Sequence, residues 1–169
     1  DKELREKFTA LIDPLRWPVD GISEDDVREI RRIKARVDSE RLPRGANPAT
    51  HLKLGRGGLA DVEWTVQLLQ MEHAHDVPGL RTTKTLDALH AAHDAGLMGA
   101  EDSACLEASW RLVSRIRNAV MLSRSKVAES MVEQATERSD LAQLMGYGIE
   151  RGQRVVEDSL RTNRLTRPA

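Results

Sequence analysis

The residues best suited to chemistry lie in one stretch of the chain, from Lys53 to Glu63. Glycines at positions 55, 57 and 58 surround Arg56, and an apolar helical pattern follows directly after them. A glycine-rich turn before a helix lets backbone N–H groups approach an anion, and the helix N-terminus adds a partial positive charge. Lys53 and Arg56 add two full charges. The stretch therefore predicts a phosphate-binding or nucleotide-binding site made by Lys53, Arg56, Gly57 and Gly58.

This glycine pattern differs from the familiar phosphate loops. It lacks the order Gly-x-x-x-x-Gly-Lys-Ser/Thr, no strand is predicted before it, and Gly-x-Gly-Gly does not match the dinucleotide fingerprint. Glycines that only let two helices pack closely would have the same spacing. The spacing alone does not decide between packing and anion binding.

Two carboxylates, Asp61 and Glu63, follow the glycines. Side chains two positions apart on a helix point about 200° away from each other, so this pair does not chelate one metal ion. The helix dipole explains Asp61 in the first turn. Glu63 lies among apolar residues of a helix that should be largely buried, where a carboxylate needs a cationic partner. We expect Lys53, Arg36 or an arginine of the segment 111–117 to supply that partner.

Other reactive side chains form no comparable group. His73 and His75 diverge on a helix, while His90 and His93 share a face without an evident thiol or carboxylate beside them. No Ser, Cys or His pattern indicates covalent catalysis. We predict neither a metal site nor a catalytic residue in this chain.

The elements that must position these residues are predicted to be helices. Apolar residues recur at helical spacing, no segment shows the alternation of a strand, and only 3% of the residues are aromatic. We predict an all-α fold, a single bundle of about five to seven helices over residues 21–169. The predicted helices are 1–12 (ended by Pro14), 24–40 (capped by Ser23), 59–75, one capped by Thr82 or Thr83 and ended by Gly96, 100–124, 139–145, and one from 152 onward.

Charge and composition exclude several classes of protein. Lys plus Arg (26) nearly balances Asp plus Glu (27), so no global field attracts nucleic acid. The helix 24–40 carries a run of basic residues, which fits a solvated face more simply than an anion site.

No segment is long and apolar enough to span a membrane. The single cysteine, Cys105, fits a reducing compartment, and we expect a cytoplasmic protein. The chain does not begin with Met, so we expect it to be a fragment.

The central stretch also resembles a known family. Lys53-Leu54-Gly55-Arg56-Gly57-Gly58-Leu59-Ala60-Asp61-Val62-Glu63-Trp64 resembles the signature of the helical domain of bifunctional glutamine-synthetase adenylyltransferase/adenylyl-removing enzymes. The form of this signature is most similar to the C-terminal, adenylylating half of those enzymes. Many members have arginine where this chain has Ala60. The resemblance continues in residues 40–45, 66–70, 80–83, 85–89, 114–118 and 145–147.

The resemblance implies a domain order and an activity. In that family a nucleotidyltransferase domain precedes the helical domain, and its Asp-x-Asp carboxylates bind magnesium. One half of the enzyme transfers AMP from ATP to a tyrosine of glutamine synthetase, and the other half removes it. This chain contains no Asp-x-Asp, so the resemblance implies the helical domain alone, inactive by itself, with residues 1–20 as the exit from the missing catalytic domain.

Three functions are compatible with this resemblance. In the first, residues 53–63 form one wall of the nucleotide site, with Asp61, Glu63 and Arg36 supporting it. In the second, the domain docks glutamine synthetase or a PII signal protein through its basic helix and does not contact nucleotide. In the third, it is a structural spacer.

Overall fold

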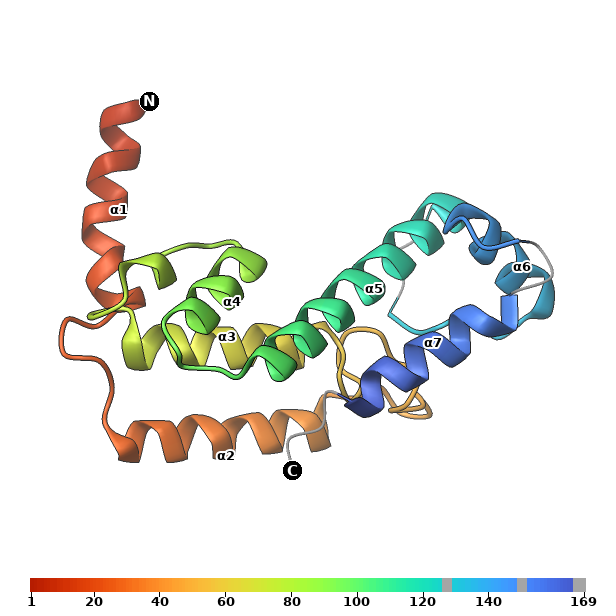
Figure 1. The fold of residues 1–169 in the computed structure, drawn as a ribbon, viewed down its shortest axis with the longest axis horizontal. Helices are drawn as coiled ribbons and strands as arrows, with labels where there is room; N and C mark the ends of the chain where they lie inside the picture. Colours follow the sequence, from red (N-terminus) through yellow and green to blue (C-terminus); the bar gives the residue numbers. More distant parts are fainter. Residues whose placement is uncertain (126–128, 149–151, 166–169) are drawn as a thin grey trace. The chain divides into compact units, whose positions relative to one another are not determined.

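The computed structural model describes residues 1–125, 129–148 and 152–165 of the chain (Figure 1). The described residues form α-helices, one 3-10 turn and connecting loops, and their only β-type pairing is an isolated bridge between His51 and Ser130. The predicted all-α fold is confirmed. The elements are α1 (Lys2–Arg16), α2 (Glu24–Glu40), α3 (Leu59–His73), η1 (Pro78–Leu80), α4 (Thr85–Asp94), α5 (Ala100–Arg124), α6 (Ala135–Leu144) and α7 (Gly152–Leu165).

These elements group into two compact units. Unit 1 comprises Asp1–Ala35 and Glu63–Ser103, and unit 2 comprises Arg36–Val62 and Ala104–Ala169. Three helices, α2, α3 and α5, contribute residues to both units. The division into an exit segment (1–20) and a bundle (21–169) stays a prediction.

Unit 2 is built around the apolar face of α5. Val113, Ile116 and Val120 recur every three or four residues on this helix and are each no more than 2% exposed. They pack with residues from the loop before α3, the start of α3, the loop before α6, and helices α6 and α7. The other members of this core are Leu52, Leu59, Ala119, Met131, Val132, Leu141, Ala142, Met145 and Val155.

The buried residues of unit 1 lie in α3 and directly after it, in η1 and α4, and at Ser103 of α5. The side-chain amide of Gln70 on α3 donates to the carbonyls of Leu80 and Thr82, both at 2.7 Å, and so fixes the turn that leads into α4. The Arg81 guanidinium donates to the carbonyls at the end of α3, Ala74 at 2.7 Å and His75 at 3.0 Å. These bonds satisfy carbonyls that a helix end leaves without partners.

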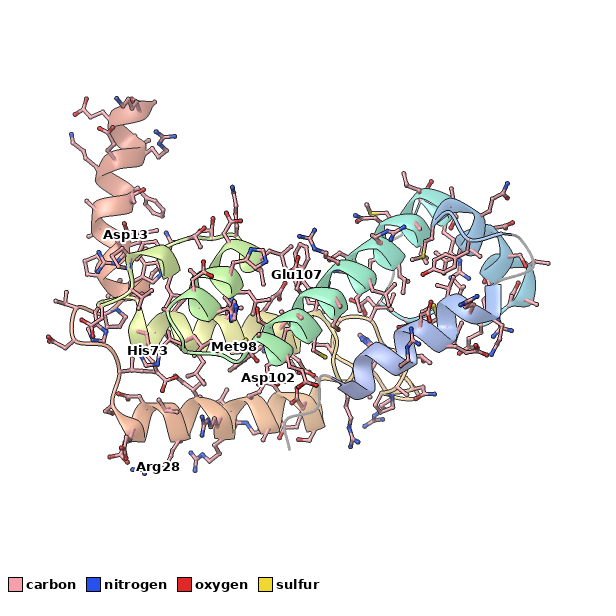
Figure 2. The ribbon with its side chains drawn as sticks, viewed as in Figure 1. Asp13, Arg28, His73, Met98, Asp102 and Glu107 are labelled. Atoms are coloured by element: carbon pink, nitrogen blue, oxygen red, sulfur yellow. The ribbon has the colours of Figure 1, made fainter. Side chains whose placement is uncertain are left out.

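Three helix limits differ from the sequence prediction. The first helix continues through Pro14 to Arg16, because Trp17 N–H donates to Asp13 O (2.8 Å) and the Arg16 side chain pairs with the Asp13 carboxylate (3.3 Å). Asp13 lies near the C-terminal end of α1 (Figure 2). A proline near a helix end thus costs too little to stop the helix.

The other two differences concern helix starts. Lys84, not a threonine, is the N-cap of α4, since Thr82 Oγ1 instead accepts the N–H of Lys84 (3.2 Å). Helix α6 begins at Ala135, four residues before Ser139. Its first turn is held by an ion pair between Glu137 and Arg124 of α5, which the local pattern did not reveal.

Two sequence predictions about helix ends are confirmed. Ser23 caps α2: its hydroxyl accepts the N–H of Asp26 (3.2 Å), and the Asp26 carboxylate accepts the Ser23 N–H (3.0 Å). This is the reciprocal arrangement of a capping box. At the end of α4, Gly96 has φ +73°, which favours glycine. Among the described residues no helix combines the length and hydropathy needed to cross a lipid bilayer.

Candidate functional site

The segment before α3 folds into a closed loop inside unit 2. The His51 carbonyl accepts the N–H of Gly55 at 2.9 Å, which forms a tight turn. The two ends of the loop then meet, since Leu59 N–H donates to Leu52 O at 3.2 Å and Ala60 N–H donates to Lys53 O at 3.0 Å. We call residues 51–61 the glycine loop. It leads directly into the first turn of α3.

A second segment pairs with the start of the glycine loop. Leu52 N–H donates to Glu129 O at 2.7 Å, and Met131 N–H donates to Thr50 O at 2.9 Å. This pairing accounts for the bridge between His51 and Ser130. It joins parts of unit 2 that lie far apart in the sequence.

The glycines of the loop are required by close backbone contacts. A Cβ atom on Gly55 would lie 2.2 Å from His51 O and 2.4 Å from Pro48 O. On Gly58 it would meet the carbonyl oxygens of Gly55 and Lys53, both at 2.8 Å. Such distances leave no room for a side chain, whatever ligand the loop contacts. Gly57 is required for another reason, since its φ of +70° disfavours other residues.

The N–H groups of the three glycines in the glycine loop already have acceptors inside the chain. Gly57 N–H donates to the Asp61 carboxylate at 2.7 Å, and Gly58 N–H donates to Gly55 O at 2.9 Å. Asp61 N–H in turn donates to Gly58 O at 3.1 Å. A phosphate contact through Gly57 or Gly58 N–H would therefore need these bonds to open. The packing role of the glycines is visible in the structure, and their anion-binding role stays a prediction.

Ser109 of α5 anchors the loop, and the sequence analysis did not identify it. Its hydroxyl donates to Gly57 O at 2.7 Å, and the residue is fully buried. The two residues are 52 positions apart. The sequence signal that could have identified it is a serine on the inner face of an amphipathic helix. A polar residue at such a position needs a hydrogen-bond partner in the core.

His51 is the other buried polar side chain of the loop. The residue is 1% exposed, and its Nδ1 accepts the N–H of Leu54 at 3.0 Å. This bond requires an unprotonated Nδ1, so the neutral ring carries its proton on Nε2. Within the described part of the chain, buried Nε2 has no hydrogen-bond partner. His51 thus stabilises the turn that contains Leu54.

The cationic side chains predicted for the site lie on the surface of this loop. Lys53 and Arg56 are both exposed, on either side of buried Gly55. Arg36 is also an exposed residue of unit 2. Two arginines of the segment 111–117 have partners within unit 2: Arg111 pairs with Glu107 (2.6 Å), and Arg115 donates to Met145 O (2.9 Å). Lys53, Arg56, Gly57, Gly58 and Asp61 thus share one loop.

Glu63 belongs to unit 1, where it lines a cavity of about 400 Å³. Helix α3 contributes one wall of this cavity, and the end of α1 and the threonine-rich turn before α4 contribute the others. Glu63 is only partly buried, so the expected need for a cationic partner is weaker than the sequence suggested. The polar and aromatic lining residues are Arg16, Trp17, Glu63, Gln67, Gln70, Thr82, Thr83, Lys84 and Thr85.

Metal ligands are not grouped in the part of the chain that the structure describes. No set of three or more His, Cys, Asp or Glu side chains lies close enough to hold an ion. The glycine loop itself carries two exposed cationic side chains, Lys53 and Arg56, on a backbone held by hydrogen bonds within unit 2.

Comparison with known proteins assigns the class of this domain. A family model described as "GlnD PII-uridylyltransferase" matches residues 29–167, and the chain belongs to this family.

The resemblance found in the sequence is also confirmed. The chain is homologous to proteins named bifunctional glutamine synthetase adenylyltransferase/adenylyl-removing enzyme. The proteins of this name from Streptomyces coelicolor and Nocardia farcinica are each 51% identical to it, over 167 and 168 residues respectively. The protein from Mycobacterium tuberculosis is 48% identical over 164 residues. These matches cover 99%, 99% and 97% of this chain but 17%, 17% and 16% of the relatives.

Proposed function

We propose that this chain is the helical domain of an enzyme that adenylylates and deadenylylates glutamine synthetase, and so regulates nitrogen assimilation. Homology across nearly the whole chain supports this proposal. ATP and Mg²⁺ would bind chiefly to a neighbouring nucleotidyltransferase domain, because this chain has no Asp-x-Asp. The 169-residue chain alone is then inactive in AMP transfer. The same proposal makes glutamine synthetase the substrate protein and places this chain in the cytoplasm.

The glycine loop is the proposed contact with the nucleotide. Its backbone is held by hydrogen bonds that include the buried bond from Ser109 Oγ to Gly57 O, while Lys53 and Arg56 project from its surface. Nucleotidyl transfer depends on cations held where negative charge develops on the phosphates. A rigid loop lowers the cost of placing two such cations. The combination of a buried anchor with exposed cations is the observation that carries the proposal.

The roles of the other predicted site residues follow from this assignment. Gly57, Gly58 and Asp61 maintain the loop, since Gly57 N–H donates to the Asp61 carboxylate at 2.7 Å. Lys53 and Arg56 then contact the phosphates, and Glu63 and Arg36 keep the supporting role proposed for them.

The alternative function, docking of glutamine synthetase or a PII signal protein through α2, has less support. Arg28 on α2 pairs with Asp25 and with Glu24, and Arg32 pairs with Glu29 at 3.0 Å. Figure 2 shows Arg28 near the start of this helix. These pairs involve two of the five basic residues of α2, and the helix also contains six acidic residues, so it has no net positive charge to offer a partner.

Amide NMR spectra of the 169-residue chain distinguish the two functions. We expect ATP to shift the signals of residues 53–58, and a Lys53→Ala/Arg56→Ala double variant to lose those shifts. Glutamine synthetase added without nucleotide should leave α2 unchanged. Shifts confined to α2 on addition of glutamine synthetase or PII protein, with no response to ATP, would establish docking instead.

A further inference from the structure

Helix α1 has an apolar face that is left exposed among the residues that the structure describes. Leu4, Phe8, Leu11 and Leu15 follow one another at spacings of four, three and four residues, which aligns them along one side of the helix. They are 67%, 57%, 72% and 80% exposed, and no residue of α1 is buried. We call these four residues the α1 stripe.

The charged residues of α1 and its N-cap, Asp1, carry no net charge in sum. Lys7 pairs with Glu3 at 2.6 Å and Lys2 with Glu6 at 3.7 Å, and Asp1 caps the helix. Residues 1–16 contain four basic and four acidic side chains. A helix that binds anionic lipid or nucleic acid normally has a basic polar face. The charges of α1 therefore favour a protein surface as the partner of its stripe.

The small size of the α1 stripe favours a partner in the same polypeptide over a second copy of this chain as the surface that covers it. A stable dimer normally buries about 20–30 residues on each side, far more than four side chains of a 15-residue helix provide. A partner in the same polypeptide needs much less contact, because a short tether gives an effective concentration of about 1 mM or more.

The relatives are much longer than the segment that matches this chain. Their matches include α1, since they cover 99% of this chain, whereas the family model begins at residue 29. Helix α1 is thus retained in chains of which this segment is only 17%, yet it lies outside the matched family domain. We propose that the α1 stripe packs against an apolar surface of a neighbouring folded domain in the full-length polypeptide. The inference rests on the proposed function only in placing this chain within a longer enzyme.

Cysteine accessibility tests this interface without any measurement of activity. A chimaeric enzyme is made by replacing the matched 167-residue segment of the Streptomyces coelicolor relative with this chain. Leu11→Cys is introduced in a Cys105→Ala background, and Ala10→Cys is the control, because Ala10 is exposed and lies about 100–160° around the helix from the residues of the stripe. Maleimide labelling of the α1 peptide is then timed by mass spectrometry in the chimaera and in the 169-residue chain.

We expect the cysteine at position 11 to react at least about tenfold more slowly in the chimaera, because its labelling then requires local opening. The cysteine at position 10 should react at similar rates in both proteins. Equal rates at position 11 in a folded chimaera would overturn the proposal.

Two further measurements cover the remaining outcomes. If the chimaera does not fold, amide exchange in the unaltered relative and in its excised segment replaces the labelling. The peptide aligned with α1 should exchange more slowly in the full-length protein, and equal exchange would refute the interface.

Two other outcomes would also overturn the proposal. The first is a dimer of the 169-residue chain that Leu11→Glu dissociates and Ala10→Glu does not. The second is cosedimentation of the chain with anionic phosphatidylserine vesicles. Loss of AMP transfer by Lys53 variants bears on the proposed function alone.

Discussion

Replacing Gly55 by alanine tests whether the glycine loop is held as tightly as its contacts indicate. The new Cβ atom would lie 2.2 Å from His51 O and 2.4 Å from Pro48 O, so both carbonyls must move by more than 1 Å to reach ordinary contact, on the order of 3.4–4 Å. Those carbonyls accept the N–H groups of Gly55 (2.9 Å) and Arg56 (3.3 Å), and the shift therefore also weakens two hydrogen bonds.

The magnitude follows from these two effects. Overpacking costs about 1–3 kcal/mol, and two weakened hydrogen bonds cost about 1–3 kcal/mol more. Alanine recovers about 0.4–1 kcal/mol by restricting the unfolded chain. We expect a net loss of about 1–5.5 kcal/mol, or a fall in Tm of about 2–22 °C at about 2–4 °C per kcal/mol for a chain of this size.

Urea and thermal unfolding of the purified chain, followed by circular dichroism at 222 nm, measure this loss. Gly148→Ala is the matched control, because a Cβ atom there meets nothing within 4 Å and the residue lies in the same unit. Its free energy of unfolding should change by no more than about 0.5 kcal/mol. If Gly55→Ala is as stable as Gly148→Ala, the close-packed description of the loop is wrong.

Two other predictions concern polar contacts. Ser109→Ala leaves the buried Gly57 carbonyl without its hydroxyl donor, so we expect the free energy of unfolding, measured by urea titration, to fall by about 1–3 kcal/mol. The control is Ser139→Ala on α6, whose hydrogen bond is exposed, and it should lower this free energy by about 0.5 kcal/mol or less. An equal effect of the two changes would contradict the anchoring role of Ser109. The Ser23 side chain, and secondarily its backbone, lower the pKa of Asp26 by hydrogen bonding. The stabilisation from this cap is thus present above the unfolded-state pKa and is lost as pH falls through the lower folded-state pKa. An NMR titration of the Asp26 carboxyl should show a midpoint below 3.8 that rises in Ser23→Ala, and no rise would refute the assignment.

The all-α fold was predictable because helical periodicity and helix-end signals are local. Ser23 before Glu24-Asp25-Asp26 marked the start of α2, and Gly96 marked the end of α4. The missed limits depended on contacts outside the local pattern. Glu137 at the start of α6 pairs with Arg124 of the preceding helix. At the end of α1 the predicted stop at Pro14 was outweighed by two bonds to Asp13, from the Arg16 side chain and from Trp17 N–H.

The candidate site was predictable in residue types but not in their partners. The sequence identified Lys53, Arg56 and the glycines as one group, and the structure places them in one loop. It did not show that the glycine N–H groups donate to acceptors of the same loop, because hydrogen bonding depends on backbone path. Nor did it reveal Ser109, whose partner is 52 positions away.

The central claim is that Lys53 and Arg56 act on the nucleotide, and AMP transfer to glutamine synthetase by the chimaeric enzyme tests it most directly. Both side chains are exposed, so Lys53→Ala and Arg56→Ala should leave Tm unchanged. Each should lower kcat/KM by roughly 10- to 1,000-fold, as expected for the loss of a charge that stabilises the transition state. The control variant Arg32→Ala, on α2, should retain activity within about twofold. Full activity in the Lys53→Ala/Arg56→Ala double variant would contradict the account.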